Sequence, residues 1–122
     1  MSFFTATQAT TQVAQTVPNL SGGTNGKIVR ISSTNTCVNA SNSDTPAQLN
    51  ALLVKMGDVY YSSGYVDGFT GLTAGLPYFL STDGAITAAP PTPSLSVRVV
   101  FIGYAVNTTA LVFRPGTPIT GV

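Results

Sequence analysis

The chain has 122 residues, of which 43% are hydrophobic and only 7% are charged, and its formal net charge is +1. This length fits one domain, and the hydrophobic share excludes a disordered chain. A net charge this small creates no field that would attract nucleic acid or an anionic membrane, so we expect neither as a partner.

The first stretch, residues 1–23, is predicted to be an extended N-terminal arm. It carries no charged residue and is rich in Thr and Gln, and it has too little apolar surface to fold by itself. It is either a frayed terminus or an arm that adds a strand to a neighbour's sheet edge and places aromatic side chains in a pocket. We favour the arm, which makes Phe3, Phe4, Val13 and Val17 the candidate contact residues.

The N-terminus has neither the basic region nor the apolar run of a signal peptide, and no apolar stretch reaches the ~20 residues of a membrane-spanning helix. We therefore expect a protein made in a cytoplasm that remains there, with no membrane partner.

Residues 24–122 are predicted to form one all-β domain of short antiparallel strands. Alternating or continuous apolar runs between turn signals indicate strands, which we expect at residues 27–32, 36–40, 51–56, 59–66, 77–80, 85–87, 95–106 and 110–114, the seventh being the longest. Regularly spaced short strands favour a sandwich or a small β-barrel or β-tulip. We favour a closed or nearly closed barrel. Exposed sheet edges can pair with other chains unless charged side chains prevent it, and this sequence has few charged residues.

Several positions in this domain have specific backbone requirements. Asp83-Gly84 is a hairpin signal in which both residues need positive φ, and Gly64 inside a strand indicates a bulge or a close approach of another backbone. Pro46 suits the first position of a short helix over residues 46–50, which is the one helix that the sequence suggests.

The sequence offers no constellation for catalysis, for a metal or for a cofactor. It contains no His and no Glu, and its acidic residues are four Asp. Asp58, Asp67 and Asp83 each adjoin a glycine in a predicted turn, where forming the turn is their expected role. Cys37 lies in a predicted strand as a buried apolar residue. We therefore expect no enzyme and no cofactor.

The aromatic residues between positions 60 and 78 invite two interpretations. Tyr60, Tyr61, Tyr65 and Tyr78 are candidates for a core or a subunit interface. A platform that stacks on a sugar or a base would look similar, although basic residues are not interleaved with these tyrosines.

One resemblance concerns GLTAGLPYFLSTDGAIT at residues 71–87, the following Pro90-Pro91, and residues 99–112. This pattern resembles a segment of tailed-bacteriophage virion proteins, shared by capsid decoration (cement) proteins, head fibres and tail-fibre modules, and it covers roughly residues 24–114. Members of this family have no catalytic residues, so the resemblance implies no catalytic role for any residue of this chain.

The chain is most similar to a decoration protein. This resemblance implies a virion structural protein that binds the major capsid protein at the capsid surface and stabilises the capsid. It also implies a homotrimer, made in the bacterial cytoplasm, with arm 1–23 as a contact segment and residues 24–122 as a β-barrel decoration domain. The alternative is a receptor-binding or structural module of a tail or head fibre, with the four tyrosines stacked on a host glycan.

Overall fold

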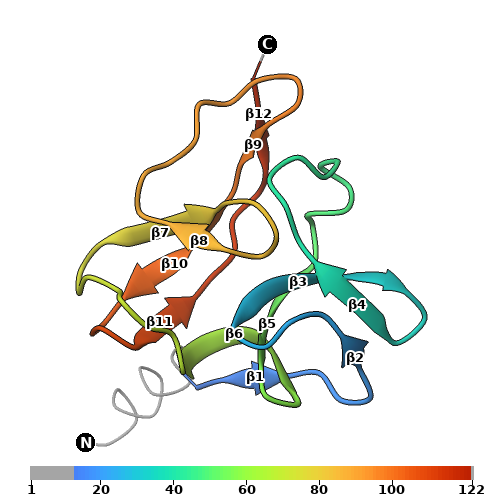
Figure 1. Cartoon of the computed structure of the whole chain (residues 1–122), viewed down its shortest axis with the longest axis vertical. Helices are drawn as coiled ribbons and strands as arrows, with labels where there is room; N and C mark the ends of the chain where they lie inside the picture. Colours follow the sequence, from blue (N-terminus) through green and yellow to red (C-terminus); the bar gives the residue numbers. More distant parts are fainter. Residues whose placement is uncertain (1–12, 122) are drawn as a thin grey trace, which may run out of the picture.

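The computed structural model describes residues 13–121 and has an all-β fold (Figure 1). Its strands are β1 (Gln15–Thr16), β2 (Ser21–Gly22), β3 (Lys27–Ser33), β4 (Thr36–Asn39), β5 (Leu52–Met56), β6 (Val59–Asp67), β7 (Pro77–Leu80), β8 (Ile86–Thr87), β9 (Arg98–Val99), β10 (Phe101–Ala105), β11 (Ala110–Phe113) and β12 (Ile119–Thr120). No helix occurs in this described range. The short helix expected at 46–50 is replaced by two consecutive turns, in which Gln48 N donates to Thr45 O and Leu49 N donates to Pro46 O.

The strands form one large mixed sheet and a separate β9–β12 pair. The large sheet has the order β2-β4-β3-β5-β6-β11-β10-β7-β8, and β1 pairs with β6 beside this path. All neighbours are antiparallel except β2 and β4. Within residues 13–121 the end strands β2 and β8 do not pair with each other, so the predicted closed barrel is not confirmed. A sandwich-like β fold is consistent with this order.

The large sheet curls so that the β7–β8 turn at one end contacts β3 and the segment after β4 near the other end. Gly84 in the β7–β8 turn accepts a hydrogen bond from Ile28 N at 2.9 Å, and Ser81 O accepts one from Asn42 N at 3.0 Å. The Asp83 carboxylate accepts another from Asn39 Nδ2 at 3.0 Å. A tight turn has too few extended residues to form the repeated backbone hydrogen bonds of a strand pair, so the sheet remains open between the β7–β8 turn and β3.

Buried side chains lie on both faces of the β3–β5–β6 part of the sheet. The smaller cluster consists of Val29, Cys37, Leu53 and Tyr60, and it is covered by Val17 and Leu20. On the other face lies the main core, formed by Ile28, Ala40, Leu49, Leu52, Val54, Val66, Phe69, Leu72, Tyr78, Leu80, Val100, Ile102, Ala105, Leu111 and Phe113. Residues 13–22 of the predicted arm therefore lie on the sheet of their own chain, through β1 and β2 (Figure 1).

Most predicted turns and strands are present, with one clear exception. Asp83 and Gly84 have φ values of 53° and 76°, as the hairpin prediction requires. The prediction of the longest strand at 95–106 is wrong, because that run is divided into β9 and β10 and the nine-residue β6 is longer. The division falls at Val100, which is fully buried and whose carbonyl accepts a hydrogen bond from Leu80 N. The two halves thus have different partners, β12 and β7.

Candidate functional site

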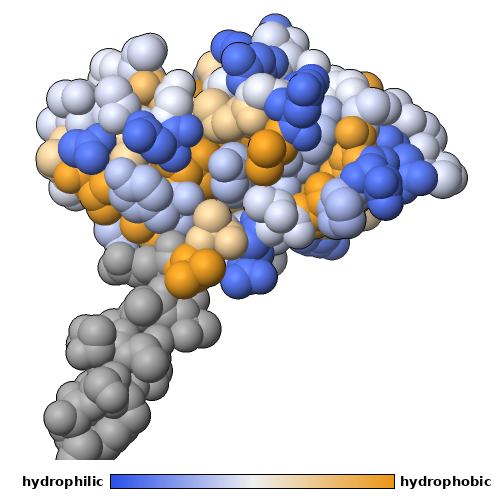
Figure 2. Space-filling view, turned by 90° about the horizontal axis from the view of Figure 1, so that it is seen from below, coloured by the Kyte–Doolittle hydropathy of each residue, from blue (hydrophilic) through white to orange (hydrophobic). Residues whose placement is uncertain are grey.

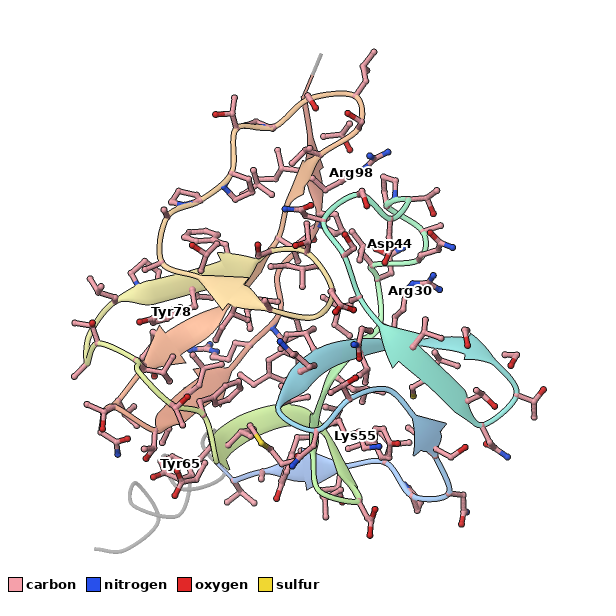
Figure 3. The ribbon with its side chains drawn as sticks, viewed as in Figure 1. Arg30, Asp44, Lys55, Tyr65, Tyr78 and Arg98 are labelled. Atoms are coloured by element: carbon pink, nitrogen blue, oxygen red, sulfur yellow. The ribbon has the colours of Figure 1, made fainter. Side chains whose placement is uncertain are left out.

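The charged side chains with resolved partners hold loops in place. Arg30 Nε lies 3.0 Å from Asp44 Oδ2 in a partly buried ion pair (Figure 3), and the same carboxylate oxygen accepts a hydrogen bond from Ser41 N. This arrangement ties the 41–50 loop to β3. In residues 13–121 no group of three or more His, Cys, Asp or Glu is placed to hold a metal ion. None of the described segments is a helix long and apolar enough to cross a membrane.

Cys37 is buried in the smaller cluster, as the sequence predicts. Burial raises the pKa of its thiol, and the nearby cation of Lys55 opposes that rise. A neutral thiol in such a place packs as a small apolar group, because the nucleophilic form of cysteine is the thiolate.

The four candidate tyrosines occupy different environments and do not form one platform. Tyr60 is buried, its hydroxyl donates to Gly22 O at 2.7 Å, and Lys55 Nζ lies 5.5 Å from its ring centroid. Tyr61, the next residue, packs half-buried against the main core. Tyr78 is buried in that core, and its hydroxyl accepts a hydrogen bond from Thr73 N. Tyr65 is 42% exposed and lies at the lower edge of the molecule, away from Tyr78 (Figure 3).

The candidate arm residues divide into two pairs. Phe3 and Phe4 lie outside the described residues. Val13 is 53% exposed and its backbone lies directly against Gly64, so that the predicted close approach at this glycine is confirmed. Val17 is partly buried over the smaller cluster, and its N–H donates to Tyr60 O at 3.0 Å.

Exposed apolar side chains are the most prominent feature of the surface. Leu95 is 74% exposed, Ile119 is 59% exposed, and Ile31 is 47% exposed. Apolar patches separated by strongly polar residues are visible when the molecule is seen from below (Figure 2). Ile31 follows the buried Val29 by two residues in β3, so the strand period places both side chains on the same face of the sheet. No signal in the sequence indicated that the segment with Val17 and Leu20, which covers Val29, would leave Ile31 exposed.

Residues 13–121 line at least two hollows on this surface. The first, here called the Phe69 hollow, has a volume of about 440 Å³ and lies beside the β7–β8 turn, with Phe69, Leu72 and Tyr78 among its apolar lining and Asn25 and Lys27 among its polar lining.

The second, here called the Val17 hollow, has a volume of about 310 Å³. Its lining is mainly apolar and contains no charged residue; it consists of Val17, Ile31, Asn50, Ala51, Leu52, Leu53, Ser62 and Pro115. An uncharged apolar hollow selects an apolar group, because filling it removes apolar surface from water.

Comparisons with protein-family models, with curated proteins and with solved structures find no match to this chain. The features that bear on its function are therefore the surface, these two hollows and the sequence pattern of residues 71–112.

Proposed function

We propose that this protein is a structural subunit of a bacteriophage particle, a capsid decoration protein that binds the outer surface of the capsid and stabilises it. The observation that carries the proposal is a charge-poor surface with large exposed apolar side chains, above all Leu95, Ile119 and Val13. Such a surface protects a free monomer poorly against association and suits a subunit whose contacts are permanent. The resemblance of residues 71–112 to virion proteins supports the same conclusion.

The extended arm, the homotrimer and the location on the capsid surface all belong to this proposal, with the major capsid protein as partner. Residues 1–12 with Phe3 and Phe4 are the proposed attaching segment. The β9–β12 tip, which exposes Leu95 and Ile119, is a second proposed contact region. Because so few charges are available, attachment should depend on apolar contacts and hydrogen bonds and should change little between low and moderate salt.

The number of copies per particle tests this proposal. Quantitative peptide mass spectrometry of purified virions should give hundreds of copies, close to a whole-number ratio to the major capsid protein. A few copies to a few tens would favour a fibre. Absence from the virion would overturn both versions of the proposal.

Removal of the arm tests the attachment. The cut should spare residues 13–17, because these pair with β6 and cover the smaller cluster. A chain without residues 2–12 should unfold at the same temperature as the full chain but should no longer decorate capsids. Normal decoration by this chain would show that the arm is not the attaching segment.

A second candidate is a fibre module that binds a host glycan, and the Phe69 hollow is the observation that favours it. The volume of this hollow lies within the roughly 300–1,000 Å³ of typical small-ligand sites, and its lining exposes more polar than apolar surface, which suits a hydroxyl-rich sugar. A glycan array should then give a signal that Lys27→Gln weakens and that Tyr65→Ala, outside the hollow, does not. An array without any signal would count against this candidate.

A further inference from the structure

We propose that the Phe3–Phe4 pair of one copy of this chain binds the Val17 hollow of a second copy, so that the copies associate head to tail. This inference deepens the proposed function, since it uses the arm as an attaching segment, but it can be tested without a capsid.

The Val17 hollow is lined by five parts of the chain, which include Ser62 of β6 and Pro115. Val17 follows β1, Ile31 belongs to β3, and Leu52 and Leu53 begin β5. Both leucines are almost fully buried, whereas Ile31 remains about half exposed. The sheet thus leaves one large apolar side chain in contact with water at the rim of an apolar hollow. This arrangement is stabilised when another apolar group covers it.

The chain itself contains a matching group. Phe3 and Phe4 are the two aromatic residues of segment 1–12, which otherwise consists largely of Thr, Gln and Ala and has no charge. Two adjacent phenylalanines offer a large apolar area at a small cost in side-chain entropy. Neither the segment nor the lining of the hollow has a charged side chain that would have to be desolvated.

The direction of the chain favours the hollow of a second copy over its own. β1 runs antiparallel to β6, with Thr16 opposite Tyr61 and Gln15 opposite Ser63, and Val13 lies against Gly64. β5 runs antiparallel to β6, with Val54 opposite Tyr61, so the path from Val17 back to Val13 follows the hollow toward its Asn50–Ala51 end. An extended continuation beyond Val13 leads past that end. Phe4 precedes Val13 by nine residues, a reach of at most about 30 Å when extended.

To fill its own hollow, the chain would have to reverse within residues 5–12. That sequence, TATQATTQ, contains none of the Gly, Pro, Asn or Asp residues that tight turns prefer. Its four threonines favour an extended backbone instead. The proposed contact of Phe3 and Phe4 is therefore with another molecule.

A head-to-tail contact uses two different surfaces of each copy. Contacts of this kind close into a ring when the rotation allows it, and otherwise continue as an open chain. A closed ring of three copies would produce the homotrimer proposed above.

The test is a complementation experiment between two variants, followed by sedimentation velocity over a range of concentrations. Phe3→Ala/Phe4→Ala removes the inserting group and leaves the hollow intact. Ile31→Lys places a charge at the rim of the hollow and leaves the arm intact, and its exposed position should tolerate the change. The full chain should associate, and each variant alone should associate at least about tenfold more weakly, a loss of about 1.4 kcal/mol.

The mixture of the two variants should form a dimer and nothing larger, because each pair then has a single complete interface. Thr5→Ala/Thr7→Ala in the arm and Val38→Lys on β4 are the matched controls, and both should associate as the full chain does. Val38 is 37% exposed and lies outside the hollow. Thermal unfolding of each variant checks that its fold is intact.

Three results would overturn the inference: a full chain that stays monomeric at the highest concentration, a Phe3→Ala/Phe4→Ala variant that associates normally, or a mixture that stays monomeric. Decoration of capsids is scored separately on the same variants. Normal association with lost decoration would contradict the inference while leaving the proposed function in place. Lost association with normal decoration would support the inference and show that the arm serves self-association alone.

Discussion

Replacing Gly64 with Ala should separate β1 from the sheet, and the structure allows the effect to be estimated. A Cβ at this position would lie 2.7 Å from Val13 C and 2.8 Å from Ala14 Cα. Backbone atoms cannot rotate away as a flexible side chain would. The clash is therefore relieved only if β1 moves off β6, which breaks the hydrogen bond from Val17 N to Tyr60 O and the pairing at Gln15 and Thr16.

Two costs add up in this variant. Gly64 has a φ of +95°, where an L-residue costs roughly 1–3 kcal/mol of strain. Each lost hydrogen bond adds about 1 kcal/mol, so the detachment of β1 should contribute roughly 2–3 kcal/mol more. Gly75→Ala is the matched control, because Gly75 has a φ of +85° but nothing lies within 4 Å of its added Cβ. The control variant should lose only the strain energy.

Urea denaturation of the three proteins measures the free energies of unfolding, and hydrogen exchange at the Val17 amide reports the detachment directly. We expect Gly64→Ala to lose roughly 2–3 kcal/mol more than Gly75→Ala, and to lose protection at Val17. Because Val17 lines the Val17 hollow, self-association of this variant should weaken as well. Equal losses in the two variants, with Val17 still protected, would refute the reasoning about the close approach.

Two further predictions concern the smaller cluster. Tyr60→Phe should lower the free energy of unfolding by about 1–3 kcal/mol, because Gly22 O loses its 2.7 Å partner. Tyr65→Phe, at an exposed site, should change that free energy by less than about 0.5 kcal/mol. Equal effects of the two substitutions in thermal unfolding would contradict a stabilising role for the Tyr60 hydroxyl. Burial raises the pKa of the Cys37 thiol in the folded chain, so its contribution to stability is complete below the unfolded-chain pKa of about 8.5 and is lost as the pH rises through the folded pKa. The urea midpoint should accordingly fall more steeply above that pH in the parent protein than in Cys37→Ala, and parallel curves would show that the thiol plays no part.

The local features of this protein were well determined by its sequence. Alternating apolar residues and turn formers predicted most of the strands, and Asp83 and Gly84 have the positive φ values that the hairpin prediction requires. The glycine inside β6 indicated a close approach of another backbone, which Val13 supplies. Such features depend on a few neighbouring residues and on steric rules that hold in any fold.

The tertiary structure decided which surfaces face each other. Tyr60 and Tyr61 are equivalent in the sequence, yet one is buried under Val17 and Leu20 while the other packs against the main core. Ile31 follows the pattern of a core residue and remains exposed, because the segment that covers Val29 does not extend over it. Whether the sheet would close, and where the hollows lie, depended in the same way on contacts between residues far apart in the chain. Periodicity assigns a side chain to one face of a strand, but only the packing of distant segments determines whether that face is covered.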